Sequence, residues 1–233
     1  MDRNRWLIFG VFCVGVIAGL IFFSGKNKID VSGRDVFVID TASEIKDHVY
    51  GNADSKIVVY EFADYQCPGC AGAFPQIKTI SDQYKDHVAF VYRNFPLTSG
   101  HQHAFAAAAT AEAAGLQGKY WEMHDLLFQT RDSWNGMTVE QRRTAFEGYV
   151  SELGLNLDQY RSDLSSEKVS MKVNTDRALG LKAGVDSTPT IFLNSKKLDA
   201  ATVNDVMKNK GDALRDMLDE LIKKNGGTPP PRS

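Results

Sequence analysis

The four residues Cys67-Pro68-Gly69-Cys70 constrain the fold of this chain more than any other feature of its sequence. They lie between residues 57–62 (IVVYEF), a β-branched and aromatic run that predicts a buried strand, and residues 71–84, whose apolar spacing predicts a helix. A disulfide needs Cβ atoms about 3.5–4.5 Å apart, whereas residues three apart in a regular helix lie about 5–6 Å apart. Cys67 is therefore expected at the start of the helix, with Cys70 in its first turn.

This placement predicts different roles for the two cysteines. The N-terminus of a helix has free N–H groups and a positive dipole end, which favour a thiolate and lower its pKa. Cys67 is therefore expected to be the attacking and leaving thiolate, and Cys70 the resolving partner. Pro68 suits the first helical position, where a missing N–H is harmless. Pro75 has no N–H to donate within the same helix and is expected to kink it.

Two other uses of the cysteines are less favoured. The chain has three cysteines, Cys13, Cys67 and Cys70, too few for a disulfide-stapled scaffold. A closed zinc site needs four ligands, and His101 and His103 stand at positions i and i+2 of a predicted helix, which do not share a face. A redox pair is thus favoured over a zinc site or a purely structural disulfide. We predict no metal and no cofactor, because no segment resembles a nucleotide, flavin or haem motif.

The first residues of the chain predict a membrane anchor. Residues 6–23 (WLIFGVFCVGVIAGLIFF) are uncharged, and about 18 such residues are roughly the minimum that spans a bilayer as a helix. The alternative is a cleaved signal peptide, whose apolar region is normally about 7–15 residues long. Cleavage after Ala18 would leave residues 20–23, which are apolar, on the mature terminus. We therefore predict a cytoplasmic tail at 1–5, a retained transmembrane helix at 6–24 and a linker at 25–40.

The remainder of the sequence predicts one α/β domain over residues 41–225, with a helical insertion at about 98–183. An apolar alternation at residues 36–39 suggests an edge strand, and residues 226–233 are expected to be disordered. Further strands are predicted at 88–92, 190–193 and 197–198, and further helices at 104–114, 120–128, 138–153, 157–164, 166–183 and 212–224. The insertion is expected to cap one end of a sheet shared by the flanking strands. The net charge of −2 gives no reason to expect a nucleic-acid partner.

Four separated motifs then resemble the DsbA-like branch of the thioredoxin superfamily, over residues 45–224. HVYGNADSKIVVYEFADYQCPGC resembles the entry strand and active site of that family. YRNFPL, a His- and Ala-rich helix and GKYWEMHDLLF resemble its helical insertion, and VDSTPTIFLN resembles its cis-proline loop. Proline at the start of a strand also suits a cis peptide bond, which is energetically accessible only before proline. The resemblance implies a thioredoxin-like fold with a helical insertion, preceded here by one transmembrane helix.

The same resemblance implies the residues of the site. Thr188 and Pro189 would form the loop that lies against the cysteines and pairs with a substrate strand, with the Thr188 hydroxyl near Cys67. Pro68, Gly69, Thr188 and Pro189 are therefore expected to contact substrate. Glu61 matches a buried acid that helps to move the proton of the resolving thiol. The Pro-Gly dipeptide departs from the Pro-His of the best-known strong oxidant of the family, so an imidazole beside the reactive cysteine is absent.

The resemblance further implies a protein-disulfide oxidase whose domain lies outside the cytoplasm. Its expected partners are reduced, cysteine-containing exported proteins and a membrane protein of the DsbB or vitamin-K-epoxide-reductase type that re-oxidises it; a monomer is expected. One alternative is an isomerase or reductase with the same site, although the dedicated isomerases carry an N-terminal dimerisation module. The other is a non-catalytic chaperone or docking domain, against which the intact Cys67–Cys70 pair argues.

Overall fold

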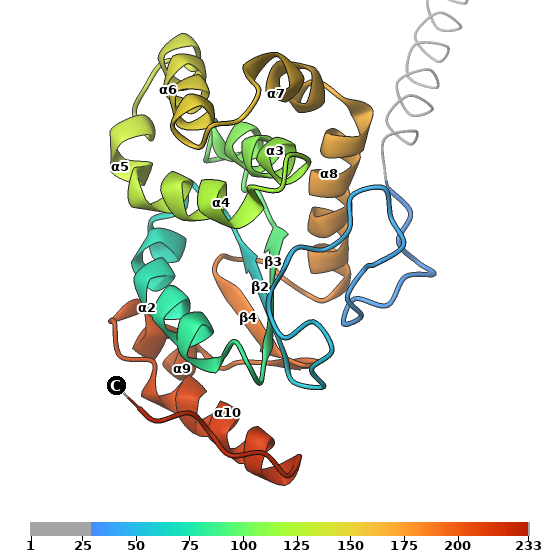
Figure 1. Cartoon of the computed structure of the whole chain (residues 1–233), viewed down its shortest axis with the longest axis vertical. Helices are drawn as coiled ribbons and strands as arrows, with labels where there is room; N and C mark the ends of the chain where they lie inside the picture. The colour runs from blue at the N-terminus through green and yellow to red at the C-terminus, as the bar shows by residue number, and fades with distance from the viewer. Residues whose placement is uncertain (1–28, 233) are drawn as a thin grey trace, which may run out of the picture. The chain divides into compact units, whose positions relative to one another are not determined.

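The computed structural model describes residues 29–232 (Figure 1). It divides into two units, Met1–Gly33 and Arg34–Ser233, and the second contains all the described helices and strands. The predicted cytoplasmic tail at 1–5 and the predicted anchor at 6–24 lie outside the described residues. Between residues 29 and 232, no helix has both the length and the apolar character needed to cross a membrane.

A five-stranded mixed sheet forms the centre of the second unit, in the order β1-β3-β2-β4-β5. Its strands are β1 (Val49–Gly51), β2 (Val58–Ala63), β3 (Ala89–Asn94), β4 (Thr190–Leu193) and β5 (Lys196–Lys197). β2 runs parallel to β3 and antiparallel to β4, which places Glu61 between Tyr92 and Ile191 in the middle of the sheet. The predicted joining of strands from both sides of the insertion is therefore confirmed.

Nine described helices surround this sheet. They are α2 (Pro68–Tyr84), α3 (Ala104–Gly115), α4 (Tyr120–Gln129), α5 (Arg131–Trp134), α6 (Val139–Glu152), α7 (Leu157–Leu164), α8 (Glu167–Lys182), α9 (Ala200–Met207) and α10 (Asp212–Lys224). On one face of the sheet, Val59 and Ile191 share a core with Ile80 of α2, Val206 of α9 and Leu218 of α10. On the other face α8 packs close to β2: a Cβ added to Gly180 would lie 2.9 Å from the Phe62 ring.

The helical insertion caps the end of the sheet to which β2 leads, as predicted (Figure 1). Its alanine-rich α3 and the aromatic residues of α4 to α7 share one core with the active-site segment. Trp134 and Tyr160 in this core are almost completely buried, as are Cys67 and Cys70. The cysteines therefore lie where the insertion meets the sheet and α2.

Buried ion pairs also tie the insertion to the sheet. Arg93 of β3 forms an ion pair with Asp47 at 2.7 Å, and Lys172 of α8 binds both Asp47 and Asp176 at 2.7 Å. All four side chains are at most 7% exposed. Buried charges are stable only when they are paired in this way, so this cluster fixes α8 against β3.

Three local features of the structure were not predicted. Residues 36–39 form a turn and a bend instead of an edge strand, because the carbonyl groups of Val36 and Val38 accept hydrogen bonds from the Arg93 guanidinium; the edge strands of the sheet are β1 and β5. Residues 226–232, for which disorder was predicted, contain Arg232, which forms ion pairs with Asp216 and Asp219 of α10. Helix α9 was not predicted.

Candidate active site

Cys67 lies at the N-terminus of α2, as predicted. It is the N-cap residue, with φ −67° and ψ 126°, and Pro68 occupies the first helical position. Cys70 is in the first turn and completely buried, whereas Cys67 is 8% exposed. Both cysteines are free thiols in the structure. Cys67 is therefore the only one of the two cysteines that keeps any exposure to solvent.

The surroundings give the two thiols opposite acidities. The hydrogen bond from the Cys70 side chain is the largest cause of the lowered pKa of Cys67, which is about 5. Thr188 and the backbone N–H groups of Gly69 and Cys70 lower this pKa further, against the effect of burial. Burial raises the pKa of Cys70 well above its ordinary value. At neutral pH Cys67 is thus a thiolate and Cys70 a thiol, while the attacking role of Cys67 and the resolving role of Cys70 stay predictions.

The loop before β4 faces the cysteines. The Thr188–Pro189 peptide bond is cis, as predicted. Cys67 Sγ lies 3.4 Å from the Thr188 carbonyl oxygen, to which only the protonated thiol can donate a hydrogen bond. The buried Thr188 hydroxyl has no hydrogen-bond partner within residues 29–232. A Cβ added to Gly69 would lie 3.3 Å from Pro189 Cδ. The Pro-Gly dipeptide and the cis-proline loop therefore form one continuous surface beside Cys67.

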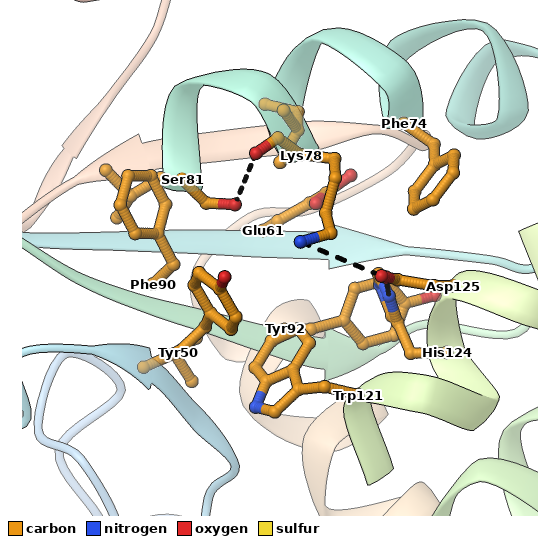
Figure 2. A pocket seen from close by; sticks show the side chains of 13 residues that line it. Tyr50, Glu61, Phe74, Lys78, Ser81, Phe90, Tyr92, Trp121, His124 and Asp125 are labelled. Atoms are coloured by element: carbon orange, nitrogen blue, oxygen red, sulfur yellow. Dashed lines mark hydrogen bonds and ion pairs between the residues drawn. The ribbon is translucent and has the colours of Figure 1, made fainter. Parts of the chain in front are cut away.

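Glu61 of β2 lies beneath α2 and lines a small pocket together with Tyr50, Lys78, Trp121 and Asp125 (Figure 2). Burial raises the pKa of Glu61 to about 7, and its charge in turn raises the pKa of Cys70. The pocket holds about 40 Å³, enough for water, which needs roughly 10–15 Å³, and far less than the roughly 150 Å³ of a cavity that binds benzene. The pocket therefore has room for a water molecule beside the residues that line it, Glu61 among them.

The segment before Cys67 contains site residues that sequence reasoning missed. The Asp64 N–H donates to Cys70 Sγ at 3.5 Å, and the Asp64 carbonyl accepts from the Cys67 N–H at 3.0 Å. The buried Asp64 carboxylate accepts a hydrogen bond from His101 Nδ1 at 2.7 Å. Gln66 binds the backbone N–H of His103 at 2.7 Å. An acidic residue directly after a strand and before the cysteine motif was the only available sequence signal.

The two histidines are therefore not placed as zinc ligands. His101 Nδ1 is bound to Asp64, and His103 is fully buried with Nε2 bound to the Met137 carbonyl at 2.7 Å. Across the described part of the chain, no group of three or more His, Cys, Asp or Glu side chains could hold a metal ion.

Comparison with known proteins agrees with this geometry. A family profile described as thioredoxin matches residues 43–209. Curated relatives include the Na(+)/H(+) antiporter NhaA 1 of Salinispora arenicola, 34% identical over 65% of this chain and 22% of that protein, and NhaA 3 of Salinispora tropica, 36% identical over the same shares. The chain thus spans about a fifth of the length of these relatives, and the antiport that their names state belongs to those proteins.

Solved structures show the same fold. A thioredoxin-like oxidoreductase from Silicibacter pomeroyi is 27% identical, with a TM-score of 0.60 over 76% of this chain and 92% of the other. BdbD from Bacillus subtilis is 21% identical, with a TM-score of 0.63 over 75% and 92%. The α-DsbA1 protein of Wolbachia pipientis is 22% identical, with a TM-score of 0.62 over 76% and 92%. The predicted thioredoxin-like fold with a helical insertion is therefore confirmed.

Proposed function

The chain belongs to the thioredoxin family, and from this membership we propose that it is a protein thiol–disulfide oxidoreductase acting mainly as an oxidase. The observation that carries the proposal is the contrast between Cys67 and Cys70, two thiols in one helical turn with the pKa of one lowered to about 5 and that of the other raised. Such a contrast is what directional disulfide exchange needs. One cysteine must be reachable and a good leaving group, and the other must be shielded.

The proposed reaction transfers two electrons from a client to the protein. A client thiolate attacks Cys67 Sγ of the oxidised pair, the Cys67–Cys70 bond breaks, and Cys70 leaves as a thiolate that takes up a proton. A second client thiolate then attacks the client sulfur of the mixed disulfide, and Cys67 leaves as a stable thiolate. The products are an oxidised client and a reduced Cys67–Cys70 pair.

Glu61 is proposed to supply the proton that the Cys70 thiolate takes up. Its raised pKa of about 7 keeps a large fraction of the carboxyl group protonated at neutral pH. The pocket that it lines lets it regain a proton from water after each turnover. A carboxyl group with an ordinary pKa would be almost fully ionised and could not act as this acid.

The direction of the net reaction follows from the stability of the Cys67 thiolate. A low pKa stabilises the reduced form of the pair and makes the disulfide a stronger oxidant. This supports the oxidase over the reductase, which needs a stable disulfide.

Location and partners are proposed from the N-terminal sequence. We infer that residues 6–24 anchor the domain on the extracytoplasmic side of a membrane, where exported proteins acquire disulfides. Turnover requires an electron acceptor, for which a membrane protein of the DsbB or vitamin-K-epoxide-reductase type is proposed. Reduced exported proteins are the proposed clients.

Oxidation of a reduced, unfolded client with several cysteines tests the proposed function. The oxidised full-length chain should restore client activity stoichiometrically, and Cys67→Ala should abolish this. Client refolding that is unaffected by Cys67→Ala would instead indicate the chaperone alternative. Repair of scrambled but not of reduced client would indicate an isomerase.

A further inference from the structure

The peptide groups of Asp64 connect the two cysteines of the site. The Asp64 N–H donates a hydrogen bond to Cys70 Sγ, with 3.5 Å between nitrogen and sulfur. The Asp64 carbonyl accepts a hydrogen bond from the Cys67 N–H at 3.0 Å. A small displacement of this residue would therefore move a donor away from the buried sulfur and loosen the start of α2 at the same time.

The Asp64 side chain determines where this backbone lies. Its carboxylate is completely shielded from solvent and accepts three hydrogen bonds: from Gln66 N at 2.7 Å, from Leu97 N at 2.9 Å and from His101 Nδ1 at 2.7 Å. Hydrogen bonds to a carboxylate are stronger than those between neutral groups. Leu97 and His101 belong to the segment that opens the helical insertion, so the insertion holds the active-site loop from outside.

His101 is the only one of these donors that comes from a side chain. Its side chain is 23% exposed and therefore lies at the edge of the core. The bond to Asp64 places the proton of the neutral ring on Nδ1, because the carboxylate can only accept. Replacing His101 therefore removes one donor to Asp64 and leaves the backbone donors in place.

The Cys70 sulfur is the atom that this arrangement stabilises. In the first exchange step its sulfur leaves as a thiolate in a fully buried position, and burial penalises that charge. The Asp64 N–H lowers the penalty. Because a thiol of lower pKa leaves faster, any loss of this donor should slow attack on the disulfide.

We propose that His101 is a positioning residue for the exchange reaction, holding Asp64 so that its N–H stabilises the leaving Cys70 sulfur. This role rests on the proposed function, since it concerns the same step. In that step the attacking thiolate forms a bond to Cys67 Sγ, and the electron pair of the Cys67–Cys70 bond stays on Cys70, which is then protonated. The Pro-Gly dipeptide has no imidazole beside Cys67. The imidazole of His101 acts instead on the Cys70 sulfur, through Asp64.

The test measures the rate at which reduced glutathione opens the Cys67–Cys70 disulfide of the full-length protein. His101→Ala should lower this rate about three- to tenfold, because one hydrogen bond that holds Asp64 is lost. His101→Asn keeps an N–H donor near the place of Nδ1 and should stay within about twofold of the wild type. His87→Ala is the matched control, since His87 lies in the loop between α2 and β3, and it should not change the rate.

A merely structural role for His101 would lower the free energy of unfolding and leave the rate of glutathione attack unchanged. Equal rates for wild type, His101→Ala and His101→Asn would therefore overturn the proposal. If His101→Ala does not fold, His101→Gln takes its place, because its amide is one methylene further out; equal rates for the Asn and Gln variants would then contradict the proposal. Failure of the proposed function is distinguished by a separate measurement: the oxidised wild-type protein would then not oxidise a reduced client.

Discussion

Lowering the pH should remove a definite part of the stability of the reduced protein by protonating Cys67. In the folded state the pKa of Cys67 is about 5, against an ordinary value of 9.0. A folded-state pKa below the unfolded value stabilises the protein fully above the unfolded pKa. That stabilisation decreases as the pH falls from 9 and is lost once the pH passes through 5.

The size of this effect follows from the two pKa values. At pH 7 the Cys67 thiol is ionised in the folded state and protonated in the unfolded state. Since pH 7 lies two units above the folded-state pKa, ionisation of Cys67 stabilises the folded state by about 2.7 kcal/mol at this pH. Cys70 adds nothing between pH 4 and pH 7, because both its ordinary pKa of 9.0 and its raised pKa in the folded state keep it protonated there. Glu61 has its own pH dependence of opposite sign, since its pKa is raised. The Glu61 contribution cancels when the stability of a reference variant that retains Glu61 is subtracted from that of the wild type.

Urea unfolding of the reduced full-length chain and of Cys67→Ser between pH 4 and pH 7 measures the effect. The stability of the wild type minus that of the variant should increase by about 2.7 kcal/mol over this range, nearly all of it above pH 5. A difference that stays constant or decreases with pH would refute the assigned acidity of Cys67.

Three further changes probe other parts of the site and fold. Glu61→Gln should slow glutathione attack on the disulfide roughly tenfold or more. When the rate is corrected for the fraction of glutathione thiolate, it should decline above pH 7 in the wild type and not in the variant. An unchanged pH profile would exclude Glu61 as the acid. Thr188→Val replaces a buried hydroxyl that has no hydrogen-bond partner in the described structure with a methyl group. If this hydroxyl turns toward the Cys67 thiolate and stabilises it, the pKa of Cys67 should rise by about one unit in iodoacetamide alkylation, and no shift would show that the hydroxyl does not stabilise the thiolate. Lys172→Met should cost about 3–5 kcal/mol of unfolding free energy in urea, against about 1 kcal/mol or less for Lys168→Met, which removes a partly exposed ion pair; equal losses would show that the buried cluster has no special weight.

The features that the sequence predicted well are local ones. Cys67, Pro68 and Cys70 could be placed because strand, cysteine motif and helix follow each other directly, so that neighbouring residues decide the geometry. The cis peptide bond before Pro189 could be predicted for the same reason, since the choice depends on one bond at the start of a strand. The helical insertion was also predictable, because its apolar spacing is regular over many turns.

The features that were missed depend on contacts between distant segments. Asp64 and His101 are 37 residues apart, and neither stands in a pattern that predicts a pair. The alternation at residues 36–39 is typical of a strand, but the carbonyl groups of Val36 and Val38 are bound by Arg93, which comes from β3. No local rule gives such a partner, since the choice is made by the tertiary fold.

The equilibrium reduction potential of the Cys67–Cys70 pair, measured against glutathione, tests the proposed oxidase role most directly. A Cys67 thiolate that is stable at neutral pH predicts a potential near about −120 mV, in the range of strong oxidants. A potential near about −270 mV, in the range of reductases, would contradict it.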